Sequence, residues 1–111
     1  MGATNFYVQE SGKTAREAFI DAREEACYME GHGGYTGTIA EKSSFKLSRK
    51  PEGFNPQEWE SLVAEFDVED KTQDYYYELK RDSKIYEDKW GPALCITAGH
   101  NNYIFCGYAS C

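Results

Sequence analysis

Hydrophobic and polar residues alternate at the start of the chain, which is the pattern of a half-buried β-strand. Between Thr4 and Gln9, Phe6 and Val8 fall on one face, and the intervening side chains fall on the other. The turn residues Ser11–Gly12 follow directly. We therefore expect a first strand that contributes one face to a hydrophobic core.

After this strand the apolar period changes to that of an amphipathic helix. Thr14 and Glu17 have the spacing of a capping box. Gly31 stands where a helix commonly ends in a left-handed conformation. The residues of the apolar face are Ala15, Ala18, Phe19, Ala22, Ala26 and Met29. The sequence predicts a first helix between Thr14 and Gly31.

A glycine-rich segment, residues 31–42, follows this helix and becomes strand-like toward its end. Phe45 and Leu47 continue as an extended stretch after a bend at Ser43–Ser44. A second amphipathic helix is then predicted from Asn55, because asparagine is a favourable cap and proline follows it at the first helical position. The apolar positions of this helix are Trp59, Leu62, Val63 and Phe66.

Residues 67–89 favour no single structure. Tyr75, Tyr77 and Leu79 alternate as in a strand, whereas the charged residues between them equally suit the surface of a helix. Strand and helix therefore both remain open for this segment.

The end of the chain predicts a β-hairpin. Ala93–Ala98 and Tyr103–Ala109 are apolar and β-prone, and the four residues Gly99–Asn102 separate them. With a four-residue loop, Cys95 would lie directly opposite Cys106 on one face of the sheet.

These elements predict one α+β domain, residues 1–111: a small antiparallel or mixed sheet with two helices packed on one face and a C-terminal β-hairpin. No apolar run reaches the roughly 18 residues that a membrane span needs. The opening residues lack the pattern of a secretory signal. We therefore expect a cytoplasmic protein, without membrane contact, whose cysteines are free thiols.

Three motifs lack the spacing or the position that their function requires. Gly12-Lys13-Thr14 imitates the end of a phosphate-binding loop, but Tyr7 stands where the pattern requires a further glycine. The glycines after Gly31 follow a helix, whereas those of a dinucleotide fingerprint precede one. His32 and His100 with the cysteines lack the paired spacing of a zinc site, so no metal and no cofactor are expected.

The negative charge of the chain is concentrated in one segment. Between Glu58 and Glu78 there are eight acidic residues and only Lys71 as a basic one, which gives −7, the net charge of the whole chain. By contrast Lys42, Lys46, Arg49 and Lys50 oppose only Glu41 in their own stretch. The plain interpretation of the acidic segment is a solvated surface that keeps the protein soluble. The alternative is a surface that recognises a basic partner.

Three segments carry a resemblance to a known group of proteins. They are GHGGYTGTIAEK at residues 31–42, KWGPA at residues 89–93 and YIFCGYAS at residues 103–110. Together with the short strand and alanine-rich helix at the start, they resemble small uncharacterised proteins of bacteriophages and their bacterial hosts. The acidic middle of the chain resembles that group poorly. The resemblance implies an accessory protein of a phage or mobile element, and it implies no catalytic residues.

The main functional hypothesis is a non-enzymatic, phage-type protein that binds a host protein and inhibits or modulates it, as anti-defence (anti-CRISPR-like) proteins do. Its partner would have a basic surface such as a nucleic-acid channel, because carboxylates interleaved with tyrosines imitate phosphates and stacked bases. Direct contact with nucleic acid is disfavoured, since phosphate contacts need a basic face. The candidate contact residues are Glu58, Glu60, Glu65, Asp67, Glu69, Asp70, Asp74, Tyr75, Tyr76, Tyr77 and Glu78.

Two other classes of function remain open. One is a binder, or sponge, of a small anionic nucleotide-derived ligand, held by the glycine-rich loop with a lysine as counter-charge. Its candidate residues are His32, Gly33, Gly34, Tyr35, Lys42 and Lys46. The other is a small cysteine-dependent enzyme, in which Cys27 or Cys106 pairs with His32 or His100.

Overall fold

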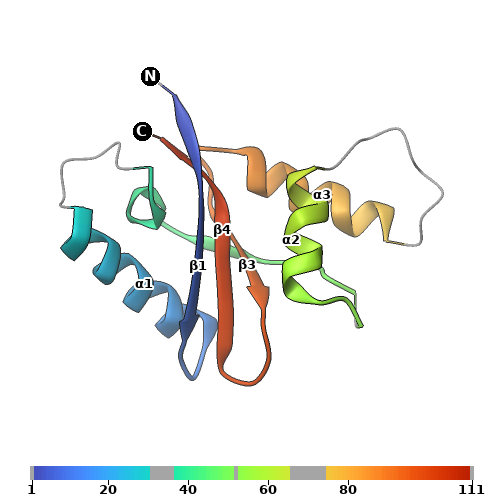
Figure 1. Ribbon diagram of the computed structural model, residues 1–111, viewed down its shortest axis with the longest axis horizontal. Helices are drawn as coiled ribbons and strands as arrows, with labels where there is room; N and C mark the ends of the chain where they lie inside the picture. The colour runs from blue at the N-terminus through green and yellow to red at the C-terminus, as the bar shows by residue number, and fades with distance from the viewer. Residues whose placement is uncertain (1, 31–36, 52, 66–74, 111) are drawn as a thin grey trace.

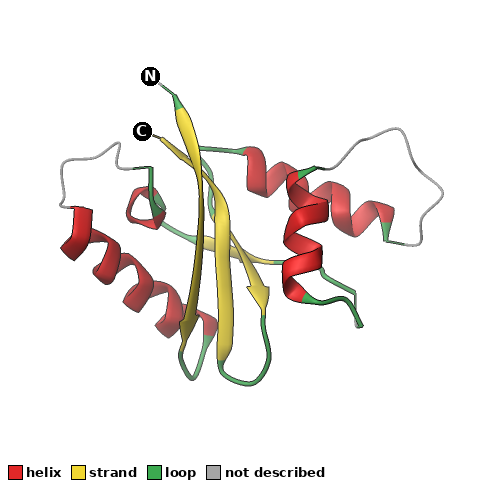
Figure 2. Cartoon of the chain, in the orientation of Figure 1, coloured by secondary structure: helices red, strands yellow, loops and turns green. Residues whose placement is uncertain are grey.

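The computed structural model describes residues 2–30, 37–51, 53–65 and 75–110 (Figure 1). Within these residues the chain forms three α-helices, one 3-10 helix and four strands (Figure 2). Their order is β1 (Ala3–Ser11), α1 (Ala15–Glu30), η1 (Ile39–Glu41), β2 (Phe45–Leu47), α2 (Pro56–Ala64), α3 (Tyr76–Glu87), β3 (Ala93–Thr97) and β4 (Asn102–Ser110).

The four strands form a single mixed sheet in the order β1-β4-β3-β2. β4 pairs antiparallel with both β1 and β3, and β2 runs parallel to β3. The predicted α+β class, the mixed sheet and the C-terminal hairpin are therefore confirmed.

The helices begin where the capping signals place them. The backbone N–H of Glu17 donates to the hydroxyl of Thr14 (3.2 Å), and the N–H of Gln57 donates to Asn55 Oδ1 (2.8 Å). The undecided segment contains α3, and exposed charged residues of that helix, such as Arg81, Lys84 and Glu87, form its outer surface. Residues 39–41, expected to be strand-like, form η1 instead, capped by the hydroxyl of Thr38.

Helices cover both faces of the sheet, which corrects the expectation of two helices on one face (Figure 1). α1 and η1 pack on the face that carries Phe6, Cys95 and Phe105. α2 and α3 pack on the opposite face, with Trp59 and Tyr86 among their buried residues. Because side chains alternate along a strand, β3 and β4 contribute buried residues to both clusters.

The hairpin has a shorter loop than expected. Residue 98 pairs with residue 102, since the N–H of Ala98 donates to the carbonyl of Asn102 (3.0 Å). Three residues therefore make the turn, with Gly99 at φ 115° and Asn101 at φ 57°. Cys95 consequently lies opposite Phe105, and Leu94 lies opposite Cys106. The two cysteines are on opposite faces of the sheet, so the prediction that they share a face is wrong.

Candidate functional site

A buried carboxylate determines where α3 lies. Asp82 is fully buried and accepts hydrogen bonds from Trp59 Nε1 of α2 (2.6 Å) and from the backbone N–H of Arg49 (3.2 Å). It also accepts a hydrogen bond from the hydroxyl of Ser48, directly after β2. This one side chain therefore joins α3 to α2 and to the end of β2.

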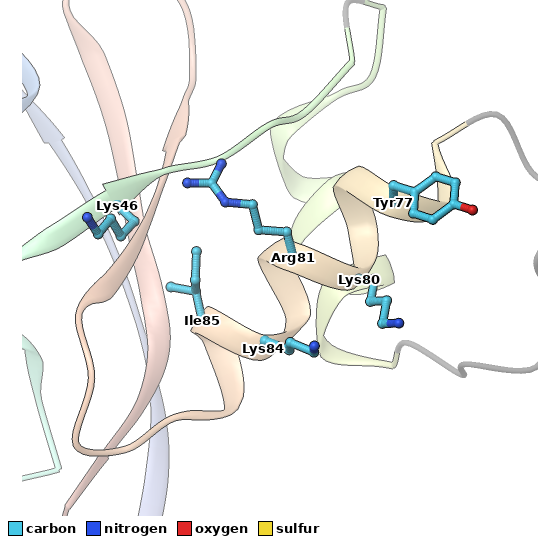
Figure 3. A pocket seen from close by; sticks show the side chains of 6 residues that line it. All are labelled: Lys46, Tyr77, Lys80, Arg81, Lys84 and Ile85. Atoms are coloured by element: carbon cyan, nitrogen blue, oxygen red, sulfur yellow. The ribbon is translucent and has the colours of Figure 1, made fainter.

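The opposite side of α3 is exposed and borders a hollow of about 410 Å³. Five lining residues come from α3 with helical spacing, so they project from neighbouring turns, and the sixth comes from β2. The lining residues are Lys46, Tyr77, Lys80, Arg81, Lys84 and Ile85 (Figure 3). The hollow thus combines two elements that are well separated in the sequence.

The lining of this hollow is strongly basic. Four of its six described lining residues are lysine or arginine, and none is acidic, although the chain as a whole has a net charge of −7. Arg81 extends toward β2, whereas Lys80 and Lys84 reach outward from α3 (Figure 3). The ring of Tyr77 is 78% exposed and offers a flat aromatic surface beside these cations. The arrangement suits a ligand that combines negative charge with a planar group.

The residues of the predicted acidic surface occupy different environments. Glu58 and Glu65 are exposed on and next to α2, and Glu78 is half-buried in α3. Glu60 is also half-buried, and its Oε1 accepts a hydrogen bond from the hydroxyl of Tyr86 (3.2 Å). The remaining acids lie outside the described residues: Asp67, Glu69, Asp70 and Asp74.

The three consecutive tyrosines also point in different directions, because each residue of a helix is turned about 100° from the last. Tyr75 packs against the rings of Phe54 and Trp59, at centroid distances of 4.9 and 5.7 Å. Tyr76 is buried. Tyr77 alone of the three projects into solvent, and it does so on the basic side of the helix.

The two lysines proposed as counter-charges have separate roles. Lys42 is 1% exposed, and its Nζ donates to the carbonyls of Asp88 (2.9 Å) and Gly91 (3.1 Å). Burial lowers the pKa of Lys42, while the nearby Asp88 carboxylate opposes this shift. Lys42 therefore serves the fold, and only Lys46 faces a hollow. The other residues of that prediction, His32, Gly33, Gly34 and Tyr35, lie outside the described residues.

The environment of the buried cysteines does not favour nucleophilic chemistry. Burial raises the pKa of the Cys95 thiol to about 12 and that of Cys106 well above its ordinary value. Because the thiolate is the reactive form, both residues are inert thiols at neutral pH. Cys27 is half-buried on α1, and His100 lies in the hairpin turn.

Thiol labelling of the native protein should therefore leave Cys95 and Cys106 unmodified. We expect a maleimide at neutral pH to modify these two residues only after urea unfolding, with the sites identified by mass spectrometry. Between the ordinary thiol pKa and about 12, the unfolded chain loses the Cys95 proton before the folded one. This group's contribution to stability should therefore fall as the pH rises through that range. Rapid native labelling of Cys106 would contradict this description of the core.

Two further findings concern the described residues. In that part of the chain, no group of three or more His, Cys, Asp or Glu residues is arranged to hold a metal ion. Likewise, none of the described helices has the length and hydrophobicity required to cross a membrane.

No model of a protein family matches the chain, and no match is found among curated proteins or solved structures. The basic hollow is therefore described from the structure of this protein, without a relative for comparison. The charge pattern of the sequence does not reveal this hollow. The acidic segment ends at Glu78, and the cations Lys80, Arg81 and Lys84 follow shortly after it, so the two groups are not separated along the chain. Assigning residues 76–87 to a helix is the step that places these three on one side.

Proposed function

We propose that this protein is a non-catalytic binding protein whose basic hollow holds a small phosphate-bearing ligand of the nucleotide class. The observation that carries the proposal is the gathering of Lys46, Lys80, Arg81 and Lys84 around one hollow of an otherwise acidic protein. It retains the ligand class of the anionic-ligand hypothesis but moves the site from the glycine-rich loop to α3 and β2.

The chemistry of the lining supports this ligand class. Lysine and arginine are the usual partners of phosphate oxygens, and a guanidinium group can bind two of them at once. An exposed tyrosine ring provides a stacking surface for a base. The volume of about 410 Å³ falls in the usual range for small-molecule sites. The hydrogen bonds of Asp82 with Ser48 and Arg49 hold α3 beside the end of β2, which fixes the position of the helix that carries three of the four cations.

Reversing two charges of the hollow should abolish this binding. We expect the double variant Lys80→Glu/Lys84→Glu to lose the thermal stabilisation that ATP, cyclic di-AMP or inorganic triphosphate gives to the wild type. A ligand at a hundred times its dissociation constant stabilises a protein by about 2.7 kcal/mol, which a thermal-shift assay readily detects. Tyr77→Ala should weaken ATP binding and leave inorganic triphosphate binding unchanged, because only the former has a base to stack.

The matched control is Arg16→Glu, because Arg16 is an exposed cation on α1, across the sheet from the hollow. The Arg16→Glu variant should bind the three phosphate compounds as the wild type does. If none of the three compounds stabilises the wild type at millimolar concentration, the proposal fails. An oligothymidine single strand included in the same series tests the prediction that the chain makes no direct contact with nucleic acid.

A second candidate function is the phage-type modulator of a host protein, acting in the cytoplasm, where its thiols stay reduced. Two observations favour it: Glu58 and Glu65 are exposed, and residues 58–78 hold charge equal to the net charge of the chain. A surplus of negative potential in one segment accelerates association with a basic partner surface.

For this second candidate, the variant Glu65→Lys/Asp67→Lys/Glu69→Lys/Asp70→Lys should no longer bind the partner protein. In a pull-down from host lysate, we expect the wild type to capture a basic protein at low salt and to release it at high salt, because screening weakens exposed charge pairs. The variant should capture none while its circular dichroism stays unchanged. Capture of the same protein by both forms, at either salt concentration, would exclude the acidic surface as the contact.

A further inference from the structure

One edge of the sheet carries no neighbouring strand in the described residues. β1 is the terminal strand and pairs with β4 alone, over nine residues in continuous register. An edge of this kind presents unpaired backbone N–H and C=O groups. Natural edges are commonly protected by charged side chains, above all lysine, by proline or by a bulge. Ala3–Ser11 contains one charged residue, Glu10, near its end, and it has no lysine, proline or bulge.

A groove of about 400 Å³ lies between this edge strand and α1. On the β1 side it is lined by the four consecutive residues 5–8. Phe6 and Val8 belong to the face of β1 that packs toward α1, and Asn5 and Tyr7 alternate with them. Its other wall is formed by Ala22, Ala26 and Met29 of α1, and residues 37–39 also line it. An open strand edge beside an apolar helix surface is the geometry in which proteins bind an extended peptide as an additional strand.

Acidic side chains give this groove a preference for a cation. Glu25 lines it, and the negative charge of Glu25 also acts on the carboxyl group of Glu10 in β1. The pKa of Glu10 is raised, first by burial and then by the negative charges of Glu25 and Asp21. Three carboxylates from two elements are thus crowded together, and a basic side chain nearby would relieve their repulsion.

We propose that the groove between β1 and α1 binds an extended segment of a partner protein, which adds to the sheet as a strand beside β1. The segment has alternating apolar side chains that pack against Ala22 and Ala26, and a lysine or arginine that reaches Glu25. Backbone hydrogen bonds to the edge provide affinity, and the alternating side chains provide the choice of partner. The groove borders α1 and the basic hollow borders α3, and these two helices lie on opposite sides of the sheet (Figure 1).

The probe for this site is a fluorescent peptide with blocked ends, Lys-Thr-Val-Thr-Val-Thr-Lys. Its valines and lysines fall on one face of an extended chain, and a lysine at each end allows either strand direction. We expect saturable binding by fluorescence anisotropy, with NMR amide shifts confined to β1 and to the α1 residues of the groove. The same peptide with every second backbone nitrogen methylated should not bind, because methylation removes the donors that an added strand requires.

The variant Glu25→Lys should lower the affinity for the probe peptide by about tenfold or more, because it replaces an attractive charge with a repulsive one. It should fold normally, since it relieves the repulsion of Glu10. The matched control is Glu24→Lys, the exposed neighbour on α1 that does not line this groove. It should bind the probe nearly as the wild type does.

Five results would overturn the proposal. Four concern the probe peptide: the absence of binding at millimolar peptide, equal affinity for the methylated peptide, equal weakening by Glu24→Lys and Glu25→Lys, and amide shifts located on α3. Dimerisation through β1 without peptide, seen as concentration-dependent shifts in that strand, would assign the edge to a second copy and would also overturn it. None of these measurements depends on a ligand in the basic hollow.

Discussion

Replacing Asp82 with alanine is expected to lower the free energy of unfolding by about 3–5 kcal/mol, because it leaves one buried and two partly buried donors without an acceptor. The donors are Trp59 Nε1, the hydroxyl of Ser48 and the backbone N–H of Arg49. Asp82 is itself 0% exposed, so water cannot replace the lost carboxylate without reorganising the interior. Urea denaturation followed by circular dichroism measures the loss.

Two companion variants separate the network from a general effect of substitution on α3. Asp82→Asn keeps one carbonyl oxygen as an acceptor and should lose less stability than Asp82→Ala. Glu87→Ala removes an exposed carboxylate from the same helix and should change stability by less than about 0.5 kcal/mol. A loss below about 1 kcal/mol in Asp82→Ala would show that this carboxylate does not hold α3 in place.

The second large effect is expected from Phe105→Ala, on the other face of the sheet. Phe105 is fully buried in the centre of β4, with its ring 5.5 Å from that of Phe19 and 5.8 Å from that of Phe45. Removing a buried phenylalanine side chain costs about 3–5 kcal/mol, through lost burial and through the cavity that remains. The same urea denaturation experiment gives the value.

Tyr28→Ala provides the contrast for this variant. Tyr28 is 88% exposed on α1, so its removal should change the free energy of unfolding by less than about 0.5 kcal/mol. Similar losses in Phe105→Ala and Tyr28→Ala would contradict the packing of α1 and β2 around Phe105. Both variants remove an aromatic side chain, so the difference between them measures the effect of burial in the cluster around Phe105.

The local elements could be predicted because their signals lie within a few residues. Thr14 and Asn55 each cap a helix through a bond to an N–H two or three residues away. The alternation around Phe6 and Val8 likewise specifies which face of β1 is buried. Each of these signals depends only on residues that are close together in the sequence, and the structure shows all of them.

The hairpin register could not be predicted with the same certainty, because a loop that is longer or shorter by one residue changes the pairing of every residue in the two strands. Asn101 adopts a positive φ, which allows a three-residue turn in place of four. A register shift of one residue moves a side chain to the other face of the sheet. That single residue separates Cys95 from Cys106 in the folded protein.

The placement of helices on both faces has a signal in the sequence of β3. Ala93, Leu94, Cys95 and Ile96 form an uninterrupted apolar run, and all four are buried. A strand with one solvated face would alternate, so such a run indicates that both faces of β3 are covered. The basic hollow had no comparable signal, because Lys46 and α3 become neighbours only through the buried contacts of Asp82.

The alternation along β4 has a consequence for how the protein loses its structure. Phe105 belongs to the layer under α1, and the next residue, Cys106, belongs to the layer under α2 and α3. Both layers are therefore built on the same two central strands. Melting of one layer exposes the strands on which the other depends, so the two halves are expected to unfold in one cooperative transition.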